Sequence, residues 1–233
     1  MHAQPAITRR TIALRPPLRA VAALAAVAVL LAGCGSGDWS QPHAKPAPVG
    51  TLGPGFIDPT HRPAPESTIT PRPGSWTEVH PSQDYRVVLL TTGDDRPTKT
   101  LVAAVQNWAE EEDVDLRTVV AANPADYVPS ITKAMEMGPD LIVSAGDHLI
   151  DPLSLVAPNH LAQQFLVVGA ELAEPTHNVT AADWSGASFR GEGLGMSTTY
   201  DPNSFTPERC AAAIRAGVAA VLNDLTGIVI WLD

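Results

Sequence analysis

Short apolar segments alternate with longer amphipathic segments over the last two thirds of this chain, and that alternation constrains the fold more than any other feature. Residues 86–91, 116–122, 140–146 and 164–169 form nearly continuous apolar runs that are rich in Val, Leu and Ile. Runs of this kind are typical of strands that are buried on both faces of a parallel sheet. The sequence therefore predicts an α/β domain rather than an antiparallel sandwich or a helical bundle.

Helices are expected between and after these strands. The pattern predicts three of them, over residues 98–113, 126–138 and 151–160. A short strand at 178–182, a helix at 205–223 and a last strand at 227–232 follow. Thr206 is placed to cap the long helix, with Pro207 at its first position. Right-handed crossovers then give a doubly wound, flavodoxin-like parallel sheet with helices on both faces.

The N-terminus carries an export signal. Four arginines precede an uncharged run at residues 20–32, which has the length of a signal-peptide apolar region and is too short to span a bilayer. The sequence Leu-Ala-Gly-Cys, ending at Cys34, resembles the bacterial lipobox, whose cysteine becomes the acylated first residue of a lipoprotein. We expect residues 1–33 to be a lipoprotein signal peptide and Cys34 to carry the lipid. An uncleaved anchor or an ordinary secretory signal is the alternative.

Residues 34–83 are dense in Pro, with Gly, Ser, Thr and His, and they show no helical or strand period. Such a composition predicts a semi-extended tether that links the membrane to a domain over residues 84–233. Trp39, Phe56 and Trp76 interrupt this segment. They are interpreted as linker residues, with local docking as the alternative.

The charge of the chain limits its possible partners, and its cysteine content limits how the fold can be stabilised. Without the first 33 residues the chain keeps 11 Lys and Arg against 25 Asp and Glu. That acidic balance argues against a nucleic-acid partner, which requires a basic surface. If Cys34 is acylated, Cys210 is left alone, so an apolar core rather than a disulfide must hold the fold.

Candidate ligand-binding residues follow the expected strands. In a doubly wound sheet, ligands lie beyond the carboxyl ends of the strands. The polar residues at those positions are Asp94, Asp95, Asp147, His148, Glu171 and Asp183. They predict an acidic crevice that suits a cationic or hydroxyl-rich ligand. The alternatives are a solvated turn with Asp95 capping the next helix, and a surface pairing of Asp147 with His148. No sequence motif indicates a catalytic group, a metal site or a cofactor.

Several segments resemble the basic membrane protein family. These are residues 140–146 with the helix from Asp151, then residues 165–169 and 178–180, and more loosely residues 189–195. The family comprises nucleoside-binding lipoproteins that serve ATP-driven (ABC) importers and have type I periplasmic-binding folds. The resemblance implies a solute-binding role, a small polar ligand such as a nucleoside, and an ABC permease as partner.

The sequence also departs from that family. Family members have two lobes around the ligand, whereas this chain has enough sequence for one lobe. Gly169 and Ala170, followed by Glu171, stand where the family has an aspartate that holds ribose hydroxyls. The sequence therefore predicts a non-enzymatic, lipid-anchored domain on the extracytoplasmic face of the membrane, either solute-binding or an envelope module that contacts a protein or cell-wall partner.

Overall fold

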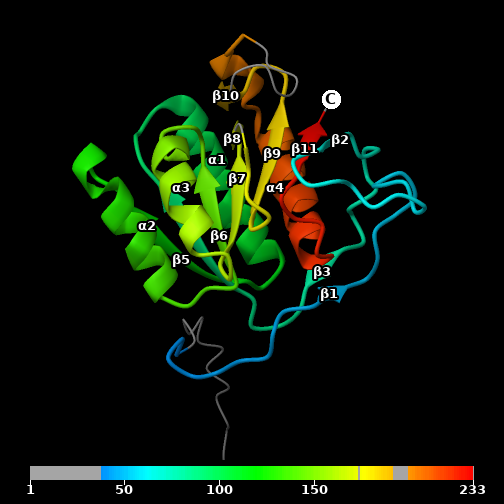
Figure 1. Cartoon of the computed structure of the whole chain (residues 1–233), viewed down its shortest axis with the longest axis horizontal. Helices are drawn as coiled ribbons and strands as arrows, with labels where there is room; N and C mark the ends of the chain where they lie inside the picture. The colour runs from blue at the N-terminus through cyan, green and yellow to red at the C-terminus, as the bar shows by residue number, and fades with distance from the viewer. Residues whose placement is uncertain (1–37, 173, 191–198, 233) are drawn as a thin grey trace, which may run out of the picture. The chain divides into compact units, whose positions relative to one another are not determined.

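A parallel sheet forms the centre of the protein. The computed structural model describes residues 38–172, 174–190 and 199–232. The sheet has seven strands in the order β2-β11-β9-β7-β6-β4-β5, and every neighbouring pair runs parallel (Figure 1). Its strands are β2 (Thr68–Ile69), β4 (Arg86–Thr91), β5 (Asp115–Val120), β6 (Leu141–Ala145), β7 (Gln164–Val168), β9 (Val179–Trp184) and β11 (Val229–Leu232).

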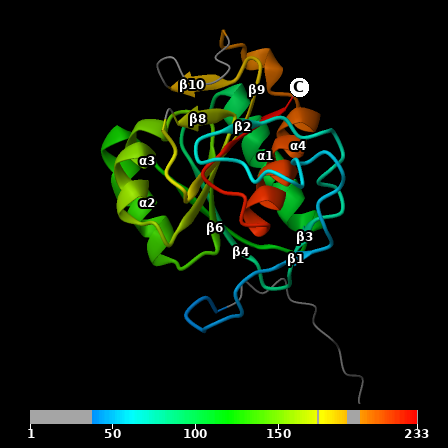
Figure 2. The same ribbon diagram turned by 45° about the vertical axis from the view of Figure 1, so that its right-hand side comes forward.

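Helices cover both faces of this sheet, so the predicted fold class is confirmed. They are α1 (Arg96–Glu111), α2 (Tyr127–Glu136), α3 (Ile150–Val156) and α4 (Pro207–Leu222). Short 3₁₀ turns lie at Pro124–Asp126, Ala157–Asn159 and Pro202–Ser204. Helix α1 packs beside α4, and α2 packs beside α3 on the opposite face (Figure 2). From β5 to β11 the strand order is that of a doubly wound, flavodoxin-like sheet.

Burial on both faces explains why the strands are almost wholly apolar. All six residues of β4 are buried. Val87 and Leu89 belong to the core on the α1 and α4 side, whereas Val88 and Leu90 belong to the core on the α2 and α3 side. Because neighbouring side chains in a strand point to opposite faces, a strand between two helical layers is apolar at successive positions along its middle, as at residues 87–90 of β4.

Local capping sets the starts of the two long helices. The side chain of Thr206 accepts a hydrogen bond from the backbone N–H of Arg209 at 3.2 Å, with Pro207 at the first helical position, as predicted. The side chain of Asp95 caps α1 in the same way, accepting from the backbone N–H of Thr98 at 2.9 Å. These bonds satisfy backbone donors that a helix leaves unpaired at its start.

The expected tether is wrong for residues 38–83. Residues 38–83 belong to the same compact unit as the rest of the domain. Phe56 and Trp76 are buried in the same core as α4, and Figure 2 shows this cyan segment over α4. Strand β2 extends the main sheet beside β11, and β1 (Pro48–Val49) pairs with β3 (His80–Pro81). Scattered aromatic residues supply the burial here, which a periodic pattern does not reveal.

A second small sheet was not predicted. Strands β8 (Ala170–Leu172) and β10 (Ser188–Arg190) pair in parallel beyond the end of β7. Gly169, at a φ of +77°, turns the chain from β7 into β8. The predicted signal peptide and Cys34 lie outside the described residues. Among the described helices, none combines the length and the apolar character that crossing a bilayer requires.

Candidate functional site

The topological switch point of the sheet lies between β4 and β6, where a doubly wound fold is expected to have a crevice. The chain leaves β4 towards α1 on one face of the sheet and leaves β6 towards α3 on the other face. Loops that part in this way open a crevice at the carboxyl ends of the two strands. The residues that follow these strands are 92–95 and 146–148, which are the positions where the sequence predicts a ligand site.

Four loop residues meet at this crevice. Gly93 has a φ of +83°, and a Cβ there would lie 3.3 Å from Oδ2 of Asp95 and 3.8 Å from Nε2 of His148. Nδ1 of His148 in turn lies 3.2 Å from Oδ1 of Asp147. Ser188 of β10 donates its hydroxyl to Oδ2 of Asp147 at 2.8 Å. We call Gly93, Asp95, Asp147, His148 and Ser188 the crevice cluster.

Asp95 has a structural role within this cluster. Its Oδ1 accepts the backbone N–H of Thr98 at 2.9 Å, and its Oδ2 accepts the Thr98 hydroxyl at 2.7 Å. Burial alone would raise the pKa of Asp95, but these bonds and the nearby His148 outweigh it and hold the pKa below its ordinary value. Asp95 is therefore a charged helix cap that also contributes negative charge to the crevice.

Asp147 and His148 are more open to solvent. Their side chains are 30 % and 43 % exposed, so both can reach a bound molecule. The crevice cluster also affects Tyr200. Burial, and then the carboxylates of Asp147 and Asp95, raise the pKa of its phenol. Ser188 and Tyr200 were missed by the sequence reasoning, because neither follows a periodic strand or helix.

Asp94 lies outside the cluster. Its side chain is 98 % exposed and pairs only weakly with Lys99, at 3.8 Å between Oδ2 and Nζ. Neighbouring aspartates in the same loop thus have different surroundings, since Asp95 turns inward to cap α1 and Asp94 turns outward.

Glu171 and Asp183 form a separate, buried pair. Each is only 2 % exposed, and among the described residues Oε2 of Glu171 and Oδ1 of Asp183 have no hydrogen-bond partner. Burial raises the pKa of Glu171 to about 7. Burial, and then the charge of Glu171, raise the pKa of Asp183 to about 8. At neutral pH both residues are therefore protonated in part, and they add less negative charge to this edge of the sheet than the sequence suggests.

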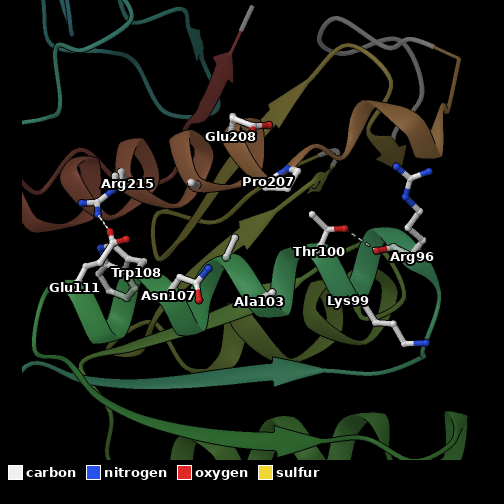
Figure 3. Close-up of a pocket in the computed structure, with 12 residues that line it drawn as sticks. Arg96, Lys99, Thr100, Ala103, Asn107, Trp108, Glu111, Pro207, Glu208 and Arg215 are labelled. Carbon is white, nitrogen blue, oxygen red and sulfur yellow. Dashed lines mark hydrogen bonds and ion pairs between the residues drawn. The ribbon is translucent and has the colours of Figure 1, made fainter.

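A groove of about 710 Å³ lies elsewhere, along the outer side of α1 and α4. Ala103 and Ala104 of α1 and Ala211 of α4 are among the residues that line it. Figure 3 shows Ala103 in the middle of the α1 side. Arg215 closes one end through an ion pair with Glu111. No member of the crevice cluster lines this groove.

No metal centre is evident in the described part of the chain. Across residues 38–172, 174–190 and 199–232, no three His, Cys, Asp or Glu side chains come together as a ligand set. The carboxylates, imidazole and hydroxyl of the crevice cluster instead offer hydrogen-bond acceptors and donors to an organic molecule.

Comparison with known proteins identifies no family. No family model matches the chain, and no curated protein matches it. Similar solved structures include an ABC transporter solute-binding protein from Aeropyrum pernix K1 (24% identity, TM-score 0.39), covering 43% of this chain and 29% of that protein. Another, from Conexibacter woesei DSM 14684 (18% identity, TM-score 0.35), covers 43% and 35% respectively.

A third similar structure is a fragment provisionally described as a lipoprotein, from Peptoclostridium difficile 630 (18% identity, TM-score 0.43). It covers 59% of this chain and 98% of that fragment. The chain thus spans less than two fifths of either solute-binding protein, and none of the three is described as a basic membrane protein. At TM-scores below 0.5 these likenesses carry no argument about function.

Proposed function

We propose that the protein is a lipid-anchored, extracytoplasmic, non-enzymatic domain that binds a small polar solute at the carboxyl edge of its sheet. The observation that supports this proposal is the meeting of Asp147, His148 and Ser188 with Asp95 at the topological switch point. Two partly exposed polar side chains beside a glycine leave room for a ligand at that place.

The chemistry of the cluster favours a cationic or hydroxyl-rich ligand. The carboxylates of Asp95 and Asp147 accept hydrogen bonds and attract positive charge, and they repel an anionic phosphate. A nucleoside, a sugar or an amine fits these requirements. Since Asp147 and His148 remain in contact with water, each hydrogen bond gains little and the affinity is expected to be weak.

Membrane anchoring and transport belong to the same proposal. Acylation at Cys34 holds the domain at the membrane, and an ABC permease is the partner that would receive the solute. The acidic balance of the chain speaks against nucleic acid as a partner.

A matched pair of variants tests the site. Nucleosides, sugars and amines are first screened by thermal shift, and the best ligand is then titrated calorimetrically. Asp147→Asn should weaken binding by about tenfold or more, because it removes a charged acceptor. Asp94→Asn, a change to the outward-facing neighbour in the same region, should leave affinity unchanged. Equal affinities for the two variants would place the site elsewhere.

The groove between α1 and α4 supports a second candidate function, as an envelope module. Its small, apolar middle suits a protein or cell-wall partner better than a polar solute. Ala103→Arg would fill the groove without touching the crevice cluster. If co-sedimentation with cell-wall preparations is lost in Ala103→Arg and kept in Asp147→Asn, the envelope role is supported; the reverse result supports the solute site.

A further inference from the structure

Trp39 is fixed to the amino edge of the sheet. Its indole N–H donates to Oδ2 of Asp115 at 2.6 Å, and the Arg117 guanidinium lies 4.1 Å from the ring centroid. Arg86 donates to the backbone carbonyls of Trp39 at 3.2 Å and Gln41 at 3.0 Å. The indole is 7 % exposed. These contacts pack the first residues of the described chain against the amino edge of the sheet.

The contacts continue a few residues further along. Nε2 of His43 lies 2.8 Å from each carboxylate oxygen of Asp140. Oδ2 of Asp140 also accepts the backbone N–H of Arg86 at 2.9 Å. Arg86 and Asp115 are the first residues of β4 and β5, and Asp140 directly precedes β6. The docking partners that form hydrogen bonds or an ion pair therefore lie at the amino ends of parallel strands, and Arg117 lies two residues into β5.

The crevice cluster lies at the opposite edge. It follows the carboxyl ends of β4 and β6, and the six residues of β4 span about 20 Å at ~3.3 Å per residue. Figure 1 shows the blue start of the described chain and strands β8 and β10 at opposite ends of the central strands. The docked segment and the candidate ligand site therefore face opposite ways.

Only four residues lie between Cys34 and Trp39. The five residue steps from Cys34 to Trp39 reach about 18 Å at most, at no more than ~3.6 Å per residue. A free tether over residues 34–83 would reach several times further. Docking of Trp39 thus replaces a long flexible link with a short one that starts from the amino edge.

We propose that an acyl group on Cys34 holds the domain with the amino edge of its sheet towards the membrane, so that the crevice faces away from it. This orientation rests on the lipid anchor of the proposed function. A solute in the crevice is presented to the envelope rather than to a permease in the same membrane. Delivery of the solute to a permease then requires Trp39 to detach from the amino edge of the sheet. We call Trp39 the latch, because its docking sets the orientation of the domain.

Förster resonance energy transfer from a dye on the protein to acceptor lipids in the membrane tests this orientation. Glu136, at the end of α2, and Ala122, beyond the end of β5, are exposed on the amino and carboxyl edges. Each is changed to Cys and labelled with a donor dye in the lipidated protein, in vesicles that carry acceptor lipids. Cys210 is buried and stays unlabelled. Transfer should be clearly stronger from position 136 than from position 122. Equal transfer, or stronger transfer from 122, overturns the proposal.

Two variants test the latch itself. Trp39→Ala removes the docked ring, and Arg117→Gln removes the stacked cation while the core keeps its packing. In either background the difference in transfer between positions 136 and 122 should shrink, with the thermal unfolding midpoint measured as a control for folding. A difference that persists in both variants shows that Trp39 does not set the orientation.

A second arm separates failure of the anchor from failure of the orientation. The described residues from 38 onward belong to one compact unit with its own core. In a chain that begins at Cys34, that thiol is coupled to a maleimide lipid. The donor dye is then attached at positions 136 and 122 through an azide-bearing residue instead of a cysteine, so that lipid and dye do not react at the same sites. If the native protein does not join vesicles but the coupled protein shows the expected difference, the anchor fails and the orientation stands. Equal transfer in the coupled protein rejects the orientation whatever the anchor.

Discussion

Phe56 and Trp76 pack edge to face, with ring centroids 6.5 Å apart and an interplanar angle of 78°. Both rings lie in a proline-rich segment, and both belong to the core that α4 shares with the sheet. Edge-to-face pairs are favourable beyond the area that they bury. This contact makes residues 48–81 an integral part of the domain rather than a linker.

The first prediction concerns this segment. Phe56→Ala should lower the free energy of unfolding by about 3–5 kcal/mol, because it empties a fully buried site. Chemical denaturation measures the change. Val49→Ala, at an exposed position of the same segment, serves as the control and should change stability by about 0.5 kcal/mol or less. A similar small effect for both variants would show that the segment adds no burial.

The second prediction concerns pH. The pKa values of Glu171 and Asp183 are raised in the folded state, to about 7 and about 8. These two residues therefore bind more protons in the folded state than in the unfolded chain between about pH 4 and 8. Their contribution to stability is fully present below the unfolded pKa and is lost as the pH rises through the folded pKa.

Glu171→Gln isolates this effect, since it keeps the shape and removes the charge. Relative to wild type, the variant should gain on the order of 1 to 3 kcal/mol in free energy of unfolding between pH 5 and pH 8. The variant must be compared with wild type because Glu112 changes the stability with pH in the opposite direction. Burial would raise the pKa of Glu112, but Arg215 and His80 outweigh that effect and lower it in the folded state. A stability difference that does not vary with pH would contradict the prediction.

The third prediction concerns the turn after β7. A Cβ at Gly169 would lie 2.7 Å from Cε1 of Phe205 and 3.3 Å from Cη2 of Trp184, at a φ of +77°. Gly169→Ala should therefore lower the free energy of unfolding by about 1–3 kcal/mol, through backbone strain and a clash with buried rings. Gly138→Ala has a similar φ with nothing within 4 Å, so it measures the strain alone. Equal losses of unfolding free energy for the two variants would show that the rings of Phe205 and Trp184 move aside without a measurable cost.

The fourth prediction concerns the anchor. Cys34→Ser should move the protein from membrane fractions to soluble fractions, because it removes the only thiol that the lipobox-like sequence offers for acylation. Ser36→Ala, two residues away, should leave the protein in the membrane fraction. Fractionation of cells that express each variant gives the answer, and membrane retention of Cys34→Ser would reject the lipoprotein interpretation.

The sequence by itself determined the long helices and six strands of the main sheet, whereas β2, β8 and β10 were not predicted. Continuous apolar runs such as residues 86–91 can only be satisfied between two helical layers, and Thr206 with Pro207 marks a helix start. These signals are local, so they survive without knowledge of the rest of the fold. The carboxyl-edge position of the crevice also follows from strand order alone.

Only the tertiary structure decided which residues of the predicted set come together. It separated Asp95 from the exposed Asp94, brought Ser188 to Asp147, and enclosed Glu171 with Asp183 where burial raises their pKa values. It also docked Trp39 on Asp115, 76 residues away in the chain. Such contacts depend on surfaces that exist only after distant strands have assembled. A proline-rich segment with scattered aromatic residues has no periodic pattern from which these contacts could be predicted.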